Sequence, residues 1–158
     1  MTKRLFFIFL LFCSVCSFAE TITGKVVKVI DGDTFDVLQD NNTTTRIRLY
    51  GIDAPEIKGG QTYWRKSKEF LAGMIAGQKV TVTVKSCDRY GRTLGVVSTS
   101  TIQDVNLEMI KAVMAWHYSY YDNIPSYRDA QDEARNARRG LWFAPDPINP
   151  YEWRKGTR

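Results

Sequence analysis

Three short segments near the start of the chain constrain its fold most strongly. Thr21–Ile30, Thr34–Gln39 and Thr44–Tyr50 are rich in β-branched residues, and turn formers separate them, at Asp31-Gly32 and Asp40-Asn41-Asn42. β-Branched runs bounded by such turn residues are typical of strands. The pattern therefore predicts three consecutive strands joined by short turns.

Two further strands and a helix are predicted in the middle of the chain. Lys79–Val84 alternates valine with threonine, the period of a strand with one buried face, and Thr93–Ser98 predicts a fifth strand. Between the third and fourth strands, Gln61–Ala76 predicts a helix that ends at Gly77. The residues expected on its packed face are Tyr63, Ser67, Phe70, Leu71 and Met74.

Two more helices are expected in the second half. One starts after Asp104, with Leu107, Ile110 and Met114 on one partly buried face. The other starts at an apparent capping box, Ser126-Tyr127-Arg128-Asp129. Its packed face comprises Ala130, Ala134, Ala137 and Leu141. This order of elements predicts an α+β fold, mainly β: a five-stranded OB-fold barrel with about three α-helices.

The proline-rich segment 145–154 is expected to be an extended strap. Proline fixes φ and lacks an amide donor, which disfavours regular helix. Two large aromatics, Tyr151 and Trp153, are expected to dock on the body of the domain. An unordered end is the alternative.

The first 19 residues have the pattern of a secretory signal peptide. Lys3 and Arg4 precede the apolar run 5–15, and Ser17 and Ala19 fit a small-residue cleavage site. The run is short for a bilayer span, although an uncleaved anchor is the alternative. We therefore expect an exported protein, periplasmic or extracellular, without stable membrane insertion after cleavage.

Cleavage would leave residues 20–158, which suffice for one compact domain but not for two. Removal of Lys3 and Arg4 lowers the formal net charge from +5 to +3. Such a modest excess suits an anionic partner and a soluble surface equally, so charge alone selects no function. We expect a monomer.

Cysteine usage excludes some kinds of site. Cys13 and Cys16 leave with the signal, so only Cys87 remains and no internal disulfide is expected. A lone thiol far in sequence from the only histidine, His117, fits a half-buried strand-end residue better than a nucleophile. The scarcity of histidine and cysteine also argues against a zinc site of the usual kind.

Four short segments concentrate carboxylates and arginines in less than half of the chain. Ca²⁺ and Mg²⁺ take oxygen ligands, and planar guanidinium groups hold phosphate oxygens with paired hydrogen bonds. The segments are Asp31-Gly32-Asp33-Thr34, Arg46-Ile47-Arg48, Asp53-Ala54-Pro55-Glu56 and Asp88-Arg89-Tyr90-Gly91-Arg92. In the third predicted strand, alternation puts Arg46 and Arg48 on the face opposite Ile47 and Leu49. Together the segments predict a site that holds a metal ion against a phosphodiester.

In order and spacing these motifs resemble the staphylococcal nuclease, or thermonuclease, family. The resemblance covers nearly all of the chain after the signal and extends to Val105-Asn106-Leu107-Glu108 and Glu152-Trp153-Arg154. It implies that Asp33 and Asp53 are carboxylate ligands of Ca²⁺, joined by the main-chain carbonyl of Ala54 and by waters. Family members often have threonine at the position of Ala54, but the backbone oxygen is the implied ligand.

The resemblance also implies the roles of the remaining site residues. Glu56 would orient or deprotonate the attacking water, while Arg48 and Arg92 would contact the phosphate and stabilise the growing charge. Asp31, Arg46, Asp88 and Arg89 would be supporting residues. An aromatic cluster falls where the family contacts the terminal nucleotide, although core packing is an equally good interpretation of each member: Tyr118, Tyr120 and Tyr121.

We therefore expect a Ca²⁺-dependent nuclease of low sequence specificity that hydrolyses DNA, with RNA as a further candidate substrate. The family precedent implies 3′-phosphate products. The alternative is a non-catalytic OB-fold module that binds nucleic acid or protein, and a third interpretation is an envelope-associated scaffold. Asp33, Asp53 and Glu56 favour the enzyme, because they would repel an anionic ligand unless a cation bridged them.

Overall fold

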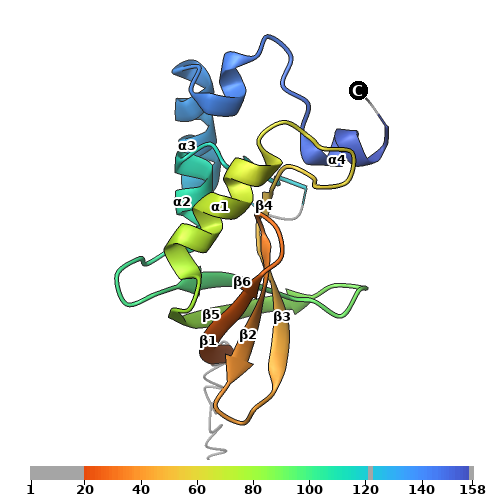
Figure 1. Ribbon diagram of the computed structural model, residues 1–158. Coiled ribbons are helices and arrows are strands. Elements are labelled where there is room, and N and C mark those ends of the chain that lie inside the picture. The colour runs from red at the N-terminus through yellow and green to blue at the C-terminus, as the bar shows by residue number, and fades with distance from the viewer. Residues whose placement is uncertain (1–19, 121–122, 157–158) are drawn as a thin grey trace, which may run out of the picture.

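Five strands close into a barrel in the order β1-β2-β3-β6-β5 (Figure 1). The computed structural model describes residues 20–120 and 123–156. All strand pairs are antiparallel except β3 with β6, which is parallel. The strands are β1 (Thr21–Val29), β2 (Thr34–Gln39), β3 (Thr44–Leu49), β5 (Lys79–Cys87) and β6 (Thr93–Ser98). The predicted α+β fold with a five-stranded barrel is confirmed.

The barrel interior is filled by the apolar face of each alternating strand. In β3, Ile47 and Leu49 are fully buried, whereas Arg46 faces solvent, as the alternation predicts. Two glycines allow the strands to approach closely, because a Cβ on Gly24 would collide with Leu38 and one on Gly95 with Val82. Cys87 is an exposed free thiol at the end of β5, more exposed than the sequence suggested.

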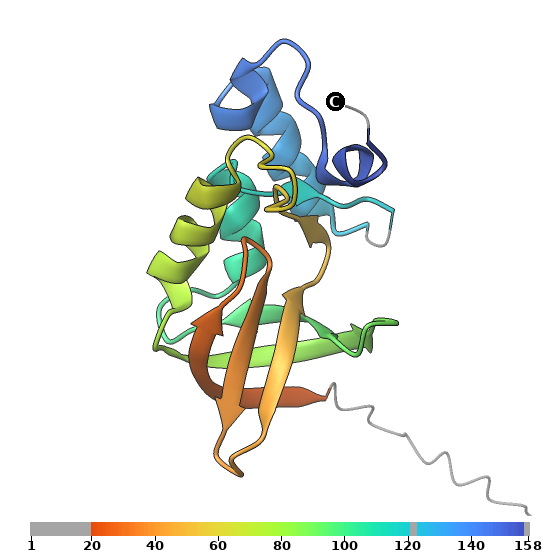
Figure 2. The same ribbon diagram turned by 45° about the vertical axis from the view of Figure 1, so that its right-hand side comes forward.

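The helices gather on one side of the barrel, where α1, α2 and α3 lie together in both views (Figure 2). Leu71 and Ile75 of α1 and Met109 and Ile110 of α2 join the barrel core. The helices are α1 (Trp64–Ile75), α2 (Val105–Lys111), α3 (Pro125–Asn136) and α4 (Pro150–Arg154), with a 3₁₀ turn at Gly140–Phe143. Within the described ranges no helix is long and apolar enough to cross a membrane.

Helix boundaries differ from the sequence predictions in ways that local chemistry explains. α2 begins after Asp104 as predicted, because the Asp104 carboxylate accepts a hydrogen bond from the Leu107 amide, but it ends before Met114. The capping box at Ser126 is wrong. Pro125 occupies the first turn, where no amide partner is needed, and Ile124 is the N-cap without a side-chain hydrogen bond.

The packed face of α1 was also predicted only in part. Its buried residues are Ser67, Leu71 and Ile75, which follow one another at intervals of four. Phe70 lies at the edge of that stripe and is 36% exposed.

The tail is not wholly extended, which corrects the prediction of a strap without helix. Pro150 begins the short helix α4, and the Asn149 side chain caps it by accepting a hydrogen bond from the Glu152 amide at 2.9 Å. Proline favours a first helical turn, so the residue that argued against a helix instead starts one. Docking of the aromatics is confirmed: Trp153 donates its indole N–H to the Lys58 carbonyl at 2.9 Å.

Two very short strands had no detectable sequence pattern, yet they help to position the site. β4 (Ile52–Asp53) pairs with β7 (Trp116–His117), which fixes Asp53 opposite Trp116. Nearby, the buried Asn106 donates to the carbonyls of Tyr50 and Gly95 and accepts from the Val97 amide. This single amide ties the end of β3 to β6 and α2, so the backbone between Arg48 and Asp53 is held on both sides.

Candidate active site

The turn between β1 and β2 carries the first two carboxylates. Asp31 accepts a hydrogen bond from the Asp33 amide at 3.0 Å, and Asp33 accepts one from the Thr34 hydroxyl at 2.9 Å. Gly32 is required here for space, since a Cβ would collide with Ser67 of α1 and with Ala54. The Asp-Gly-Asp-Thr motif is therefore pressed against both α1 and the β4 segment.

Arg48 joins the two aspartates that were predicted to bind metal. Its guanidinium Nη2 lies 2.8 Å from Asp53 Oδ1 and 3.3 Å from Asp33 Oδ2, and its Nη1 donates to the Ile52 carbonyl. Its side chain is only 12% exposed, and those of Asp33 and Asp53 still less. β3 supplies this arrangement directly, because Thr34 is opposite Arg48 in the β2–β3 ladder.

Ala54 and Glu56 complete the predicted set. The Ala54 amide donates to Asp33 Oδ2 at 3.0 Å, which places residue 54 against the first turn. The Glu56 backbone amide donates to the side-chain Oε1 of Gln61, and the Gln61 backbone amide donates to the Glu56 carbonyl. A small polar cavity of about 60 Å³ lies between the two turns, lined by Asp31, Asp33, Ala54, Pro55, Glu56 and Ile57.

Arg154 is a residue that sequence reasoning missed. From α4 its two terminal nitrogens, Nη1 and Nη2, donate to Asp53 at 3.1 and 2.8 Å, and Nη1 also donates to Glu56 Oε1 at 2.6 Å. The only signal was its position in Glu152-Trp153-Arg154, which matched the family pattern without suggesting a role. No local spacing could reveal a contact between residues 101 positions apart.

Arg92 lies directly before Thr93, which pairs with Ile47 of β3, the neighbour of Arg48 in the chain. It follows the turn between β5 and β6, which projects from the barrel in both views, and it pairs with Asp88 at 2.7 Å. Asp88 also accepts from the Tyr90 and Arg92 amides, as expected for a residue that shapes the turn. Among the described contacts of Arg92, no site carboxylate takes part.

Two of the three predicted aromatic contacts fall in the described residues. Tyr118 stacks on Tyr120 with ring centroids 6.4 Å apart and also lies 6.3 Å from Tyr151 of α4. Tyr120 is 78% exposed, which excludes core packing for that ring. Tyr121 lies outside the described residues.

The pKa values of the three site aspartates are shifted in different directions. Burial, together with the charge of Asp33, raises the pKa of Asp31 to about 7. Burial alone would raise the pKa of Asp33 as well, but Arg48 and hydrogen bonds from Ala54 and Thr34 lower it below its ordinary value. Burial raises the pKa of Asp53 in spite of both arginines. Unequal pKa values in one group of acids are typical of functional sites.

These residues suit a hard divalent cation. In the described structure Arg48 and Arg154 face the carboxylates of Asp31, Asp33, Asp53 and Glu56, which leaves an excess of negative charge. Carboxylate and carbonyl oxygens form the donor set that Ca²⁺ prefers. Within the described residues no three His, Cys, Asp or Glu side chains are arranged as a complete metal cage. The predicted ligand set contains only two such side chains, with a backbone carbonyl and waters as the remainder.

A closed OB-type barrel that gathers carboxylates and guanidinium groups at one end defines a class of small phosphodiester hydrolases. Comparison with known proteins agrees with this class. Residues 46–144 match the family model described as staphylococcal nuclease homologue.

Named relatives cover most of the chain. An uncharacterized endonuclease of Escherichia coli is 46% identical over 133 residues, 84% of this chain and 85% of the relative. An uncharacterized endonuclease of Haemophilus influenzae is 42% identical over 142 residues, 90% of this chain and 78% of the relative. A micrococcal nuclease of Shigella flexneri is 39% identical over 158 residues, 94% of this chain and 88% of the relative.

The chain belongs to the staphylococcal nuclease family. It is an endonuclease, which hydrolyses phosphodiester bonds in nucleic acid. Nucleases of this family depend on a metal ion for hydrolysis.

Proposed function

We propose that this protein is an exported, Ca²⁺-dependent nuclease of low sequence specificity, which cleaves single-stranded or locally open DNA and accepts RNA as a second substrate. One observation carries the proposal. The carboxylates of Asp33 and Asp53, the backbone of Ala54, and Glu56 converge with Arg48 at one end of the barrel, beside a small polar cavity.

The chain's own groups have distinct tasks in this proposal. Asp33, Asp53 and the Ala54 carbonyl hold the cation, which supplies electrostatic stabilisation of the phosphate's developing charge. Glu56 is one of the residues that line the cavity, and its carboxylate can orient a water molecule and accept its proton. Arg48 and Arg92 place positive charge on the non-bridging phosphate oxygens.

Arg48 and Arg92 differ in how each would reach the phosphate. Arg48 is already next to the carboxylates proposed to bind the metal. Arg92 is on a projecting turn and uses its Nε for Asp88, so its Nη groups can contact a phosphate while that pair remains. The planar guanidinium suits this task, because its paired N–H groups match the oxygens of a phosphate.

Low sequence specificity follows from the kind of base contact that the site offers. Sequence is read through contacts to base edges, whereas aromatic faces bind unstacked bases of any kind. The stacked rings of Tyr118 and Tyr120 provide such a face close to α4. Unstacked bases favour single-stranded or locally open substrates over regular duplex.

Export completes the proposal. Lys3, Arg4 and the apolar run 5–15 support a secretory signal, followed by a small-residue cleavage site at Ser17 and Ala19. Mass determination of the N-terminus after expression in a bacterial host tests the cleavage. An N-terminus at Glu20 in the periplasm or medium supports export, and an intact Met1 in the cytoplasm contradicts it.

The decisive experiment is digestion of labelled single-stranded and duplex DNA by residues 20–158, with Ca²⁺ and with chelator. We expect cleavage only with Ca²⁺, faster on single strands, and the products should carry 3′-phosphates. A Glu56→Gln variant purified in parallel controls for contaminating nuclease. DNA binding without cleavage would contradict the proposal and favour the binding module, and cleavage in chelator would contradict the metal assignment.

A further inference from the structure

The C-terminal tail inserts an arginine between two of the site's carboxylates. Arg154 Nη1 lies 2.6 Å from Glu56 Oε1 and 3.1 Å from Asp53 Oδ1, while Nη2 lies 2.8 Å from Asp53 Oδ2. The guanidinium therefore holds Asp53 by both oxygens and Glu56 by one. Paired contacts of this kind fix orientation as well as charge.

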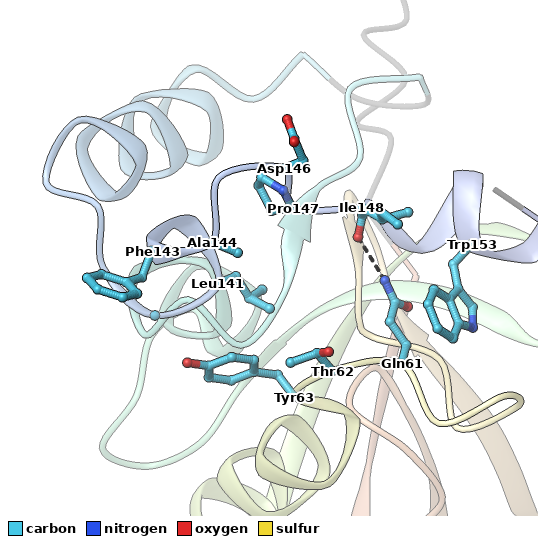
Figure 3. A pocket seen from close by; sticks show the side chains of 11 residues that line it. Gln61, Thr62, Tyr63, Leu141, Phe143, Ala144, Asp146, Pro147, Ile148 and Trp153 are labelled. Atoms are coloured by element: carbon cyan, nitrogen blue, oxygen red, sulfur yellow. Dashed lines mark hydrogen bonds between the residues drawn. The ribbon is translucent and has the colours of Figure 1, made fainter. Parts of the chain in front are cut away.

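The fold holds Arg154 in this place through several independent contacts. Asn149 caps α4 and Pro150 begins it, and the indole of Trp153, the fourth residue of this helix, donates to the Lys58 carbonyl. The loop that contains Lys58 also contacts the tail through Gln61, whose side-chain amide donates to the Ile148 carbonyl at 2.8 Å, as Figure 3 shows. Tail segment 148–154 and loop segment 54–61 are thus joined at both ends.

Gln61 makes the link between the tail and Glu56 explicit. Its side-chain oxygen accepts from the Glu56 amide while its side-chain nitrogen donates to Ile148 in the tail. The residue is only 4% exposed, so these two bonds are shielded from competing water. The backbone of Glu56 is therefore held by Gln61, and its carboxylate by Arg154.

The contact of Arg154 is also electrostatically favourable. Asp53 is almost completely buried and would otherwise have Arg48 as its only cationic partner among the described ion pairs. Although burial lowers the pKa of Arg154, the charges and hydrogen bonds of Asp53 and Glu56 raise it above its ordinary value. A charged group that satisfies a buried carboxylate in this way is costly to remove.

We propose that Arg154 is a positioning residue of the hydrolytic site, which orients the Glu56 carboxylate and Asp53 and makes turnover depend on docking of the C-terminal tail. This inference rests on the nuclease function proposed above. Arg154 acts through the carboxylates, so its loss lowers kcat more than it changes KM for DNA.

The first test compares Arg154→Gln, Arg154→Lys and wild type at saturating Ca²⁺. For Arg154→Gln we expect kcat to fall by about 10- to 100-fold, the scale for removing partners of metal ligands. Arg154→Lys should recover only part of this loss, because lysine keeps the charge without the paired geometry. The matched control is Arg139→Gln, which removes an exposed guanidinium paired with Glu133 and should leave kcat unchanged.

Ca²⁺ binding by calorimetry separates positioning from metal retention. In Arg154→Gln the affinity should change less than kcat does, because a cation rather than a ligand has been removed. An unchanged kcat contradicts the proposal. So does a higher kcat, which would make the tail inhibitory, and so does a loss that additional Ca²⁺ fully restores.

The second test does not depend on activity. Hydrogen exchange of the cation-free protein should be faster at residues 54–61 in Arg154→Gln than in wild type, with β5 unchanged as the internal reference. Unchanged exchange at 54–61 contradicts the proposal whether or not the protein cleaves DNA. Absence of cleavage by wild type would instead refute the proposed function, so the two failures are distinguishable.

Discussion

Two regions of the molecule each supply an arginine predicted to hold phosphate, but they hold that arginine in opposite ways. At the β3–β4 corner, Arg48 is 12% exposed and contacts Asp33, Asp53 and the Ile52 carbonyl. At the β5–β6 hairpin, Arg92 is 28% exposed and pairs with Asp88 alone among its described ion pairs. The charges at the corner are buried, whereas those of the hairpin pair are partly exposed.

Because of this difference, removing Arg48 affects stability as well as activity, whereas removing Arg92 affects mainly activity. Removal of Arg48 leaves two buried carboxylates without their shared partner, which destabilises the fold as well as the site. Removal of Arg92 leaves a carboxylate that water can solvate. Loss of activity in an Arg92 variant therefore reports on catalysis, whereas in an Arg48 variant it reports on catalysis and folding together.

The largest effect should come from removing the cation, which acts on the corner and not on the hairpin. We expect chelator to reduce cleavage to background and Ca²⁺ to restore it better than Mg²⁺, because a flexible set of carboxylates, carbonyl and waters suits the larger ion. Ca²⁺ should also raise Tm in wild type and in Arg92→Ala alike. A Ca²⁺-induced Tm shift that Arg92→Ala abolishes would contradict the separation of the two regions.

Next in size is Arg48→Ala, which should damage both function and stability. We expect turnover to fall by about a thousandfold or more, the scale of guanidinium groups in phosphoryl transfer. The free energy of unfolding should fall by about 3–5 kcal/mol, because buried Asp33 loses its described ion-pair partner and buried Asp53 keeps only Arg154. Urea denaturation and kinetics under conditions where the variant is folded measure the two effects, and undiminished stability would show that the corner tolerates its loss.

Arg92→Ala should lower turnover about as strongly, by roughly a thousandfold, but with little loss of stability. Its partly exposed pair with Asp88 contributes about 1 kcal/mol or less to folding. Arg89→Ala is the matched control, because Arg89 lies over the exposed ring of Tyr90 in the same turn. Near-normal activity of folded Arg92→Ala would remove Arg92 from the mechanism.

Glu56→Gln should slow hydrolysis by about 10²- to 10⁴-fold, the usual contribution of a general base. The amide keeps the shape of the side chain and retains one hydrogen bond to Arg154, so Ca²⁺ binding should persist. Kinetics and calorimetry on the same sample test this. Equal rates for wild type and variant across pH would rule out a role for the carboxylate.

The smallest effect concerns the hairpin alone and depends on pH. Burial would raise the pKa of Asp88, but hydrogen bonds from the Arg92 amide and side chain and from the Tyr90 amide lower it below 3.8. A lowered pKa stabilises the folded state above about pH 4, and this contribution disappears as pH falls through the folded value. Asp88→Asn should therefore be less stable than wild type by about 1 kcal/mol or less at pH 7, with no difference at the acid limit. A stability difference that stays constant across this range would assign the effect to shape rather than charge.

Local patterns predicted much of this molecule. β2 and β6 have the predicted boundaries, because alternation and flanking turn residues are visible within a few positions. The tail helix was missed because Pro150 argued against helix in general, while its effect depends on its place in the first turn. β4 and β7 were missed because two residues are too few to carry a period.

The sequence by itself determined the barrel, the acidic turns and the presence of two arginines suited to phosphate, since each depends on residue types close together in the chain. Only the tertiary structure decided which of these groups meet. It buried Arg48 between Asp33 and Asp53, paired Arg92 with Asp88, and brought Arg154 to Asp53 and Glu56 from the far end of the chain. Contacts over such separations arise from packing of the whole fold, and no local period or spacing records them.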